Sequence, residues 1–320
     1  MRKRIKYWFP LALGLAFVIS CDFLDTDSGS SKKKETPKDV DDVCRIIKDA
    51  DFREYVYYHF DLDDDGKVSM EEAALVEEIN LDYYHCRSLK GIEYFTGLRT
   101  LDCTANDLTE LDLSRNTKLK ILYCDENQLI SLDLSNNKEL TILWCQQNKL
   151  TSLNVSGCTA LREIYCSRNR LPKLDLSETP ALQTLSCTQN LLTSLDLSKN
   201  RSLLELYCQR NQLTSLNVSR CTELYDLICS ENLLTSLGVS NNVNLENLSC
   251  HENKLKELTI YKNLSLVTLT CGRQGDWNVT VYYAKGQPVT KWMTDEQRYG
   301  IHRDEYNEND RVIWMLVNEI

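Results

Sequence analysis

The sequence predicts a solenoid in which short coils, all copies of one unit, stack around a parallel sheet of short strands. Nine cysteines recur at a constant interval of 21 residues, and an asparagine follows three residues after eight of them. A coil this short cannot cover its own apolar face, so neighbouring coils must stack to close a core. The nine ladder cysteines are Cys103, Cys124, Cys145, Cys166, Cys187, Cys208, Cys229, Cys250 and Cys271.

Each unit divides into a strand and a turn. In the first regular unit Leu101 and Cys103 alternate with polar residues, as in a half-buried strand, and Asn106 marks the turn that follows. A second apolar pair, Leu111 and Leu113, comes after the turn. Strands stacked about 4.8 Å apart form a parallel sheet, and buried asparagine amides can pair with the backbone groups of the turns.

This unit resembles the leucine-rich-repeat family, and in particular the short bacterial units with a cysteine ladder that occur in certain internalins and in many surface lipoproteins. The resemblance covers about residues 79–271. It implies a gently curved solenoid that binds proteins or glycans on its strand face. We therefore expect leucine-rich repeats with little helix over residues 98–271.

The cysteines are expected to be small buried hydrophobic residues rather than disulfide partners. Neighbouring ladder positions would place parallel Cβ atoms about 4.8 Å apart, which is wider than the usual Cβ separation in a disulfide. Cys158 and Cys221 occupy positions that hold asparagine in other units, and they lie three coils apart. Whether Cys44 and Cys86 form a pair is left open.

The N-terminus has the pattern of an exported protein. Basic residues 1–6 precede an apolar run of about 13 residues, which is shorter than the roughly 20 that a membrane-spanning helix needs. The string Val18-Ile19-Ser20-Cys21 resembles a bacterial lipobox, which implies cleavage after residue 20 and acylation of Cys21. An ordinary secretory signal with a chance cysteine is the alternative. Residues 21–38 would form a flexible tether because they cannot bury a core.

The charge balance argues against nucleic acid as a partner. The formal net charge is −10, and it becomes −14 when the basic residues of the predicted signal peptide, 1–20, are removed. Binding to phosphates requires a basic stripe, which this chain lacks.

An acidic segment between two predicted helices resembles the twelve-residue EF-hand loop. Helices are expected over residues 51–60 and 70–77, Gly66 supplies the sharp turn, and Val68 ties the loop to its neighbour. An acidic surface turn without an ion is the alternative. Since only one loop is present, we expect a structural Ca²⁺ with an affinity of roughly 0.1 to 1 mM. The predicted ligands are Asp61, Asp63, Asp65, the carbonyl of Lys67, Ser69 and Glu72.

Both ends of the solenoid need a cover. The calcium loop and a first irregular coil, residues 39–97, are expected to form the N-terminal cap. At the other end the register is expected to fail at Gln274, where asparagine is missing. Apolar alternation at residues 277–283 and 312–317 predicts a β-rich cap over residues 272–320.

Outward positions of the strands predict a binding surface. Between residues 100 and 251 the three outward columns of the sheet contain five acids and no lysine or arginine, and the central column is rich in aromatic residues. Aromatic anchors with a polar rim are typical of interfaces and sugar platforms, although aromatic residues also simply suit strands. The candidate ligand-binding residues are Tyr123, Trp144, Tyr165, Tyr207, Glu163 and Glu205.

These patterns together predict an outer-membrane lipoprotein, on the cell surface or the periplasmic side, that binds an extracellular protein or glycan. An enzyme is not expected, because the four histidines are scattered and no nucleophile elbow, zinc spacing or phosphate loop occurs. A structural component of an envelope assembly, without a ligand on the strand face, is the main alternative. A third is an enzyme whose chemistry lies in residues 272–320. The pattern defines no oligomeric state.

Overall fold

The structure is a computed structural model that describes residues 42–272, 274, 279–283, 291–292 and 313–316. All of these belong to one compact unit, Val40–Ile320. The predicted signal peptide 1–20, the tether 21–38 and the acylation site Cys21 lie outside the described residues. No helix in the described ranges has the length and apolar character needed to cross a membrane.

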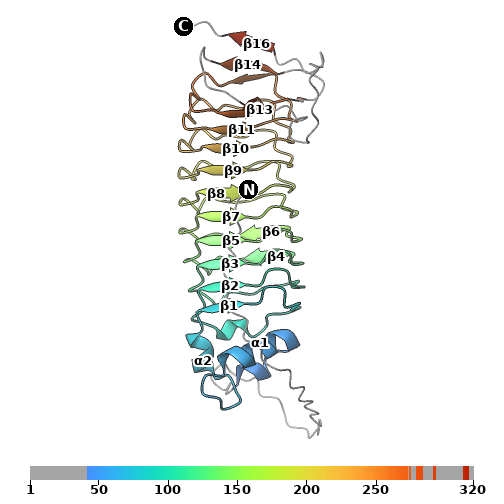
Figure 1. The fold of residues 1–320 in the computed structure, drawn as a ribbon, viewed down its shortest axis with the longest axis vertical. Coiled ribbons are helices and arrows are strands. Elements are labelled where there is room, and N and C mark those ends of the chain that lie inside the picture. Colours follow the sequence, from blue (N-terminus) through green and yellow to red (C-terminus); the bar gives the residue numbers. More distant parts are fainter. Residues whose placement is uncertain (1–41, 273, 275–278, 284–290, 293–312, 317–320) are drawn as a thin grey trace. The chain divides into compact units, whose positions relative to one another are not determined.

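An eleven-stranded parallel sheet forms the body of the unit, as predicted for a leucine-rich-repeat solenoid. Consecutive strands pair residues that occupy the same place in the repeat, such as Leu122 with Leu143. Figure 1 shows these strands stacked one above another. In spatial order they are β1 (Glu78–Asn80), β2 (Thr100–Asp102), β3 (Ile121–Tyr123), β5 (Ile142–Trp144), β7 (Glu163–Tyr165), β8 (Thr184–Ser186), β9 (Glu205–Tyr207), β10 (Asp226–Ile228), β11 (Asn247–Ser249), β13 (Thr268–Thr270) and β15 (Lys291–Trp292).

The second apolar pair of the repeat builds two smaller parallel sheets. One joins β4 (Ser131–Asp133) to β6 (Ser152–Asn154), and the other has the order β12 (Glu257–Thr259), β14 (Thr280–Tyr283), β16 (Ile313–Leu316). The strands expected near residues 277–283 and 312–317 are therefore present as β14 and β16.

Rows of identical side chains fill the interior between the sheets. Every cysteine in the described part of the chain is free and buried, Cys44 and Cys86 included, which confirms the prediction of unpaired ladder cysteines. Some ladder thiols lie near the next strand, with Cys124 Sγ 3.3 Å from the carbonyl oxygen of Trp144. Burial raises the pKa of the Cys166 thiol to about 12, so it stays protonated at neutral pH.

The buried asparagines that lie three residues after the ladder cysteines join each turn to the coil before it. Asn148 shows the pattern: its Oδ1 accepts a hydrogen bond from the Leu129 N–H at 3.0 Å. Its Nδ2 donates to the carbonyls of Cys124, Cys145 and Gln146 at 2.9 to 3.3 Å. Backbone groups that the tight turn leaves without a strand partner are thereby satisfied.

The expected failure of the register at Gln274 is wrong. Gln274 Oε1 accepts from the Leu255 N–H at 3.0 Å, and Nε2 donates to the carbonyls of Cys250 and Cys271 at 2.9 Å each. These are the partners that an asparagine would have, because the longer side chain carries the same amide. The repeat therefore continues beyond Cys271, and β15 pairs with β13.

Two short helices lie at the β1 end of the sheet (Figure 1). They are α1 (Ala50–Phe60) and α2 (Met70–Leu75), with 3-10 turns η1 (Val43–Arg45) and η2 (Ile92–Tyr94) nearby. Asp49 caps α1 by accepting from the Phe52 N–H at 3.1 Å. Phe52 packs against Phe95 with ring centroids 6.3 Å apart, so this end shares one core with the coils. The second helix stops before residue 77 because the chain turns extended at Val76 and enters β1.

Candidate functional sites

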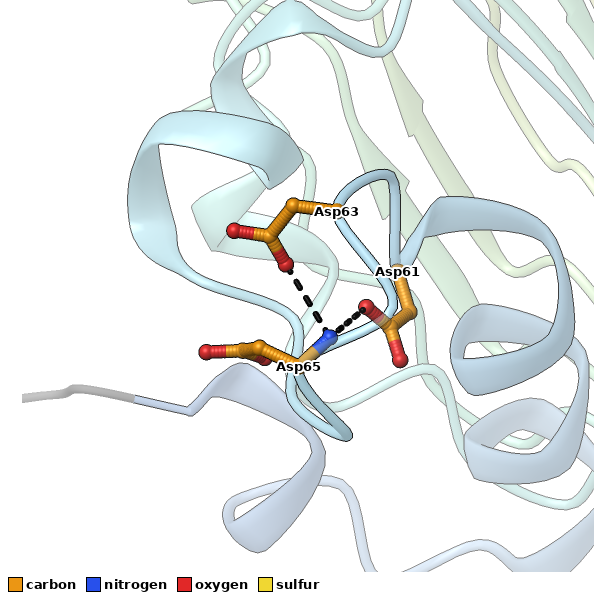
Figure 2. A group of neighbouring side chains, drawn as sticks. All are labelled: Asp61, Asp63 and Asp65. Carbon is orange, nitrogen blue, oxygen red and sulfur yellow. Dashed lines mark hydrogen bonds between the residues drawn. The ribbon is translucent and has the colours of Figure 1, made fainter.

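The acidic loop brings three of its predicted ligands together. The carboxylate oxygens of Asp61, Asp63 and Asp65 lie within 4.8 Å of one another. Figure 2 shows the first two accepting from the backbone N–H of Asp65, at 3.2 Å each. Converging carboxylates supply the hard oxygen donors that Ca²⁺ takes in proteins. The donor set of this loop fits a calcium ion.

A tight turn produces this convergence. Gly66 has a φ of +83°, in the left-handed region that favours glycine. Its N–H donates to Asp61 Oδ2 at 3.1 Å, and the Lys67 N–H donates to Asp65 Oδ1 at 2.8 Å. The chain thus wraps around the side chains that it carries.

The other predicted side-chain ligands, Ser69 and Glu72, join the loop to its second helix. They form a reciprocal capping box at the start of α2. Glu72 also accepts from the Leu62 N–H at 2.7 Å, which links the last position of the loop to its second. Partial burial opposes ionisation of Glu72, but its hydrogen bonds from Ser69, Leu62 and Asp63 outweigh this and lower its pKa. Glu72 is therefore an anion at neutral pH.

Val68, in the acidic loop, forms hydrogen bonds with the segment that precedes α1. The Val43 N–H donates to the Val68 carbonyl at 2.8 Å, and the Val68 N–H donates to Asp42 Oδ1 at 3.3 Å. The segment before α1 thus pairs with the loop.

On the main sheet, three of the four predicted aromatic residues form a continuous strip. Register pairs place Tyr123, Trp144 and Tyr165 on consecutive strands. Their ring centroids lie 5.0 and 5.3 Å apart, at interplanar angles of 67° and 64°. Trp144 is 36% exposed, while both tyrosines are partly covered. Ser186 separates Tyr207 from this strip by one strand.

Tyr207 belongs to a second, polar group. Its hydroxyl lies 3.2 Å from Glu205 Oε2 and 3.0 Å from Asp226 Oδ2, while the Tyr225 hydroxyl contacts Glu205 Oε1. Burial, followed by the charges of Asp226 and Glu205, raises the pKa of Tyr207. Glu205 is only 7% exposed, contrary to its expected outward position, so its carboxylate positions the two phenols. Glu163, by contrast, is partly exposed beside the strip.

Two isoleucines extend the strip. They were not among the ligand-binding residues predicted from the sequence. Ile121 and Ile142 are partly exposed on the strand face, lie side by side on β3 and β5, and precede Tyr123 and Trp144 by two residues. The first outward column of the repeat would have revealed them. We call Ile121, Tyr123, Ile142, Trp144 and Tyr165 the apolar patch.

Polar residues surround the apolar patch. Asp125 is 8% exposed, and its Oδ1 accepts from the Gln146 N–H at 2.7 Å. Asp102 pairs with Tyr123 in register and is partly exposed. An apolar centre with a polar rim is the usual composition of an interface.

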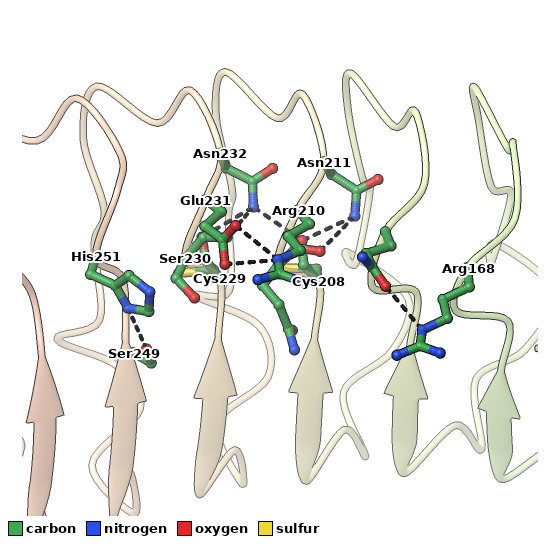
Figure 3. Close-up of polar contacts among 12 residues, drawn as sticks. Arg168, Cys208, Arg210, Asn211, Cys229, Ser230, Glu231, Asn232, Ser249 and His251 are labelled. Atoms are coloured by element: carbon green, nitrogen blue, oxygen red, sulfur yellow. Dashed lines mark hydrogen bonds and ion pairs between the residues drawn. The ribbon is translucent and has the colours of Figure 1, made fainter. Parts of the chain in front are cut away.

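Further along the sheet, Figure 3 shows polar contacts at the turns, including the ion pair between Arg210 and Glu231 at 2.8 Å. Ser249 Oγ and His251 Nδ1 lie 3.0 Å apart there. His251 is 4% exposed, so this serine and histidine are not open to a substrate.

Solved structures identify the class of this fold. No protein-family model matches the chain, and no curated protein matches it. Leucine-rich-repeat structures do match. A leucine-rich-repeat protein from Leptospira interrogans is 20% identical over 71% of this chain and 62% of its own, with a TM-score of 0.62. The leucine-rich effector YopM from Yersinia pestis is 23% identical over 77% and 65%, with a TM-score of 0.58.

The functional domain of InlJ from Listeria monocytogenes, whose structure includes a cysteine ladder, is 31% identical. The match covers 79% of this chain and 60% of that domain, with a TM-score of 0.61. The chain thus spans less than two thirds of the first two structures that it matches. The protein has the fold of a leucine-rich-repeat solenoid, with a cysteine ladder such as that of InlJ.

Proposed function

We propose that this protein is a cell-envelope lipoprotein that binds an extracellular protein or glycan through its strand face. The apolar patch carries this proposal. Its five side chains are contiguous by strand register, partly exposed to solvent, and next to acidic residues. An apolar cluster of this kind is typical of binding surfaces rather than of inert ones. Ile121 and Ile142 favour a protein partner over a glycan, because aliphatic side chains offer a sugar no hydrogen bonds.

Binding should depend on Trp144. A partner is first sought by screening extracellular proteins and glycans. Trp144→Ala and Ile142→Ala should then each raise the equilibrium dissociation constant for that partner by about 30-fold, which corresponds to about 2 kcal/mol of binding free energy. Ile130→Ala is the matched control, because Ile130 is exposed but lies next to β4, in a different sheet. Unchanged affinity in both patch variants would remove the strand face as the binding surface.

We further propose that the acidic loop binds one structural Ca²⁺ through Asp61, Asp63, Asp65, the Lys67 carbonyl, Ser69 and Glu72. Titration calorimetry with CaCl₂ should give one site with a dissociation constant of roughly 0.1 to 1 mM. Asp61→Ala and Glu72→Ala should each abolish the heat, whereas Asp175→Ala, an exposed carboxylate elsewhere, should leave it unchanged. Absence of heat with the unaltered protein would contradict the calcium site.

The anchor is a third part of the proposal. Acylation at Cys21 would attach the protein to the outer membrane through more than one lipid chain, which is the condition for stable attachment. The acidic residues Asp22 and Asp25 beside it are compatible with display at the cell surface. Mass spectrometry of the mature N-terminus should find a lipidated Cys21, and an unmodified cysteine there would exclude the anchor.

A further inference from the structure

Carboxylates gather at the N-terminal end of the strand face, directly beside the apolar patch. Asp82 follows β1, Asp102 ends β2, and Asp125 follows β3. Backbone hydrogen bonds hold these three segments side by side, from the Leu81 N–H to the Asp102 carbonyl at 2.7 Å and from the Ala105 N–H to the Asp125 carbonyl at 2.9 Å. Three acidic side chains thus occupy three consecutive coils.

Asp125 is the most deeply placed of the three, and its surroundings disfavour a negative charge. Only one hydrogen bond to its carboxylate comes from the backbone, that of Gln146. The charges that act on it, from the preceding strand and from its own turn, are the carboxylates of Asp102 and Glu126. The other titratable groups near it are the buried thiols of Cys103, Cys124 and Cys145. No lysine or arginine occupies the outward columns between residues 100 and 251.

Protonation of Asp125 removes the buried negative charge. Burial, together with the charges of Asp102 and Glu126, raises the pKa of Asp125 to about 7, although hydrogen bonds from the backbone and side chain of Gln146 act in the opposite direction. Burial, together with Asp102 and Glu126, also raises the pKa of the neighbouring Asp82. A positively charged group brought next to Asp125 would do what a proton does, because it too offsets the buried negative charge.

We propose that Asp125 is a proton-operated contact of the strand face: when ionised it holds a cationic side chain of the partner beside the apolar patch, and when protonated it releases that side chain. The proposal rests on the function proposed above, in which the strand face binds a partner. It identifies that partner as a protein with a lysine or arginine next to an apolar anchor. By linkage, partner and proton then compete for Asp125, so binding above neutral pH is tighter than binding below it.

The titration itself can be measured without a partner. Carbon NMR of the intact protein, labelled at the aspartate carboxyl carbons, should show a carboxyl that titrates near pH 7 and disappears in Asp125→Asn. The variant should fold, because an asparagine Oδ1 can still accept from the Gln146 N–H. Asp133→Asn is the control, since hydrogen bonds from Ser135 lower the pKa of that exposed carboxyl. If the signal lost in Asp125→Asn titrates below pH 5, the proposal is overturned.

Stability gives a second readout with a defined sign. Because the folded state raises the pKa of Asp125 above its ordinary value of 3.8, its contribution to stability is complete below that pH and is lost as pH rises through about 7. The unfolding midpoint should therefore fall across this range, and Asp125→Asn should remove that part of the fall. An identical pH profile in the variant would overturn the proposal.

Binding of a cation is tested with N-acetyl-arginine amide as the probe, followed by amide shifts of Tyr123 and Trp144. The dissociation constant for the probe should be about tenfold higher at pH 6 than at pH 8. In Asp125→Asn this constant should be the same at both pH values. Equal binding at both pH values would overturn the proton-operated contact while leaving strand-face binding intact. Conversely, if the partner binds Trp144→Ala with unchanged affinity, the proposed function is removed even if Asp125 titrates near pH 7.

Discussion

Replacing Asn148 by leucine should lower the free energy of unfolding by about 4 kcal/mol, among the largest effects of any single change in the repeats. Leucine has a similar size but no amide, so the Leu129 N–H would stay buried without a partner, and the Cys124 carbonyl would keep only its 3.3 Å hydrogen bond from Asn127 Nδ2. An unsatisfied buried group costs about 1 to 3 kcal/mol, and each further hydrogen bond that is lost costs about 1 kcal/mol. Denaturant unfolding followed by circular dichroism measures the loss.

Two controls separate the loss of the buried amide from the general cost of replacing an asparagine by leucine. Asn241→Leu alters an exposed asparagine with a single backbone contact at 3.3 Å and should cost less than about 0.5 kcal/mol. Asn148→Gln should cost less than Asn148→Leu, because Gln274 makes the same contacts at its own turn. Equal losses for leucine and glutamine at position 148 would contradict the role given to the amide.

Replacing Gly97 by alanine should destabilise the junction between the helical end and the coils by about 3 kcal/mol. A Cβ at Gly97 would lie 2.2 Å from the carbonyl oxygen of Ala74 and 3.1 Å from that of Val76. Both atoms belong to backbone just after the acidic loop, so they cannot rotate away as a side chain would. The segment after α2 must therefore shift.

Gly238→Ala is the matched control, because nothing lies within 4 Å of a Cβ there. It should change the free energy of unfolding by less than about 0.5 kcal/mol. Amide hydrogen exchange should accelerate at α2 and β1 in Gly97→Ala and stay unchanged at β10. Similar stabilities for the two alanine variants would contradict the tight contact.

Periodicity explains why the fold could be predicted from the sequence. Residues 21 apart must occupy equivalent places once coils stack, so the pairing of Tyr123 with Trp144 follows from the register alone. The acidic loop was predictable for a different reason, because its ligands lie within twelve consecutive residues. The aspartate cluster therefore depends on local chain geometry and not on distant contacts.

Features that break the repeat could not be predicted in the same way. Glu205 is buried, and its carboxylate accepts a hydrogen bond from Tyr225, which directly precedes β10; no other unit has a tyrosine at that position. Gln274 keeps the register because a longer side chain can place the same amide, which a search for asparagine overlooks. Gly97 is crowded by backbone from α2, and the repeat contains no information about that contact.

Hydrogen exchange of the protein with and without its partner tests strand-face binding most directly. Protection on binding should appear in β3, β5 and β7, which carry the apolar patch, and should be absent from β4 and β6. Those two strands belong to the same stretch of coils but form a separate sheet, so they serve as an internal reference. Protection confined to β4 and β6, or to the acidic loop, would contradict the assignment of the strand face as the binding surface.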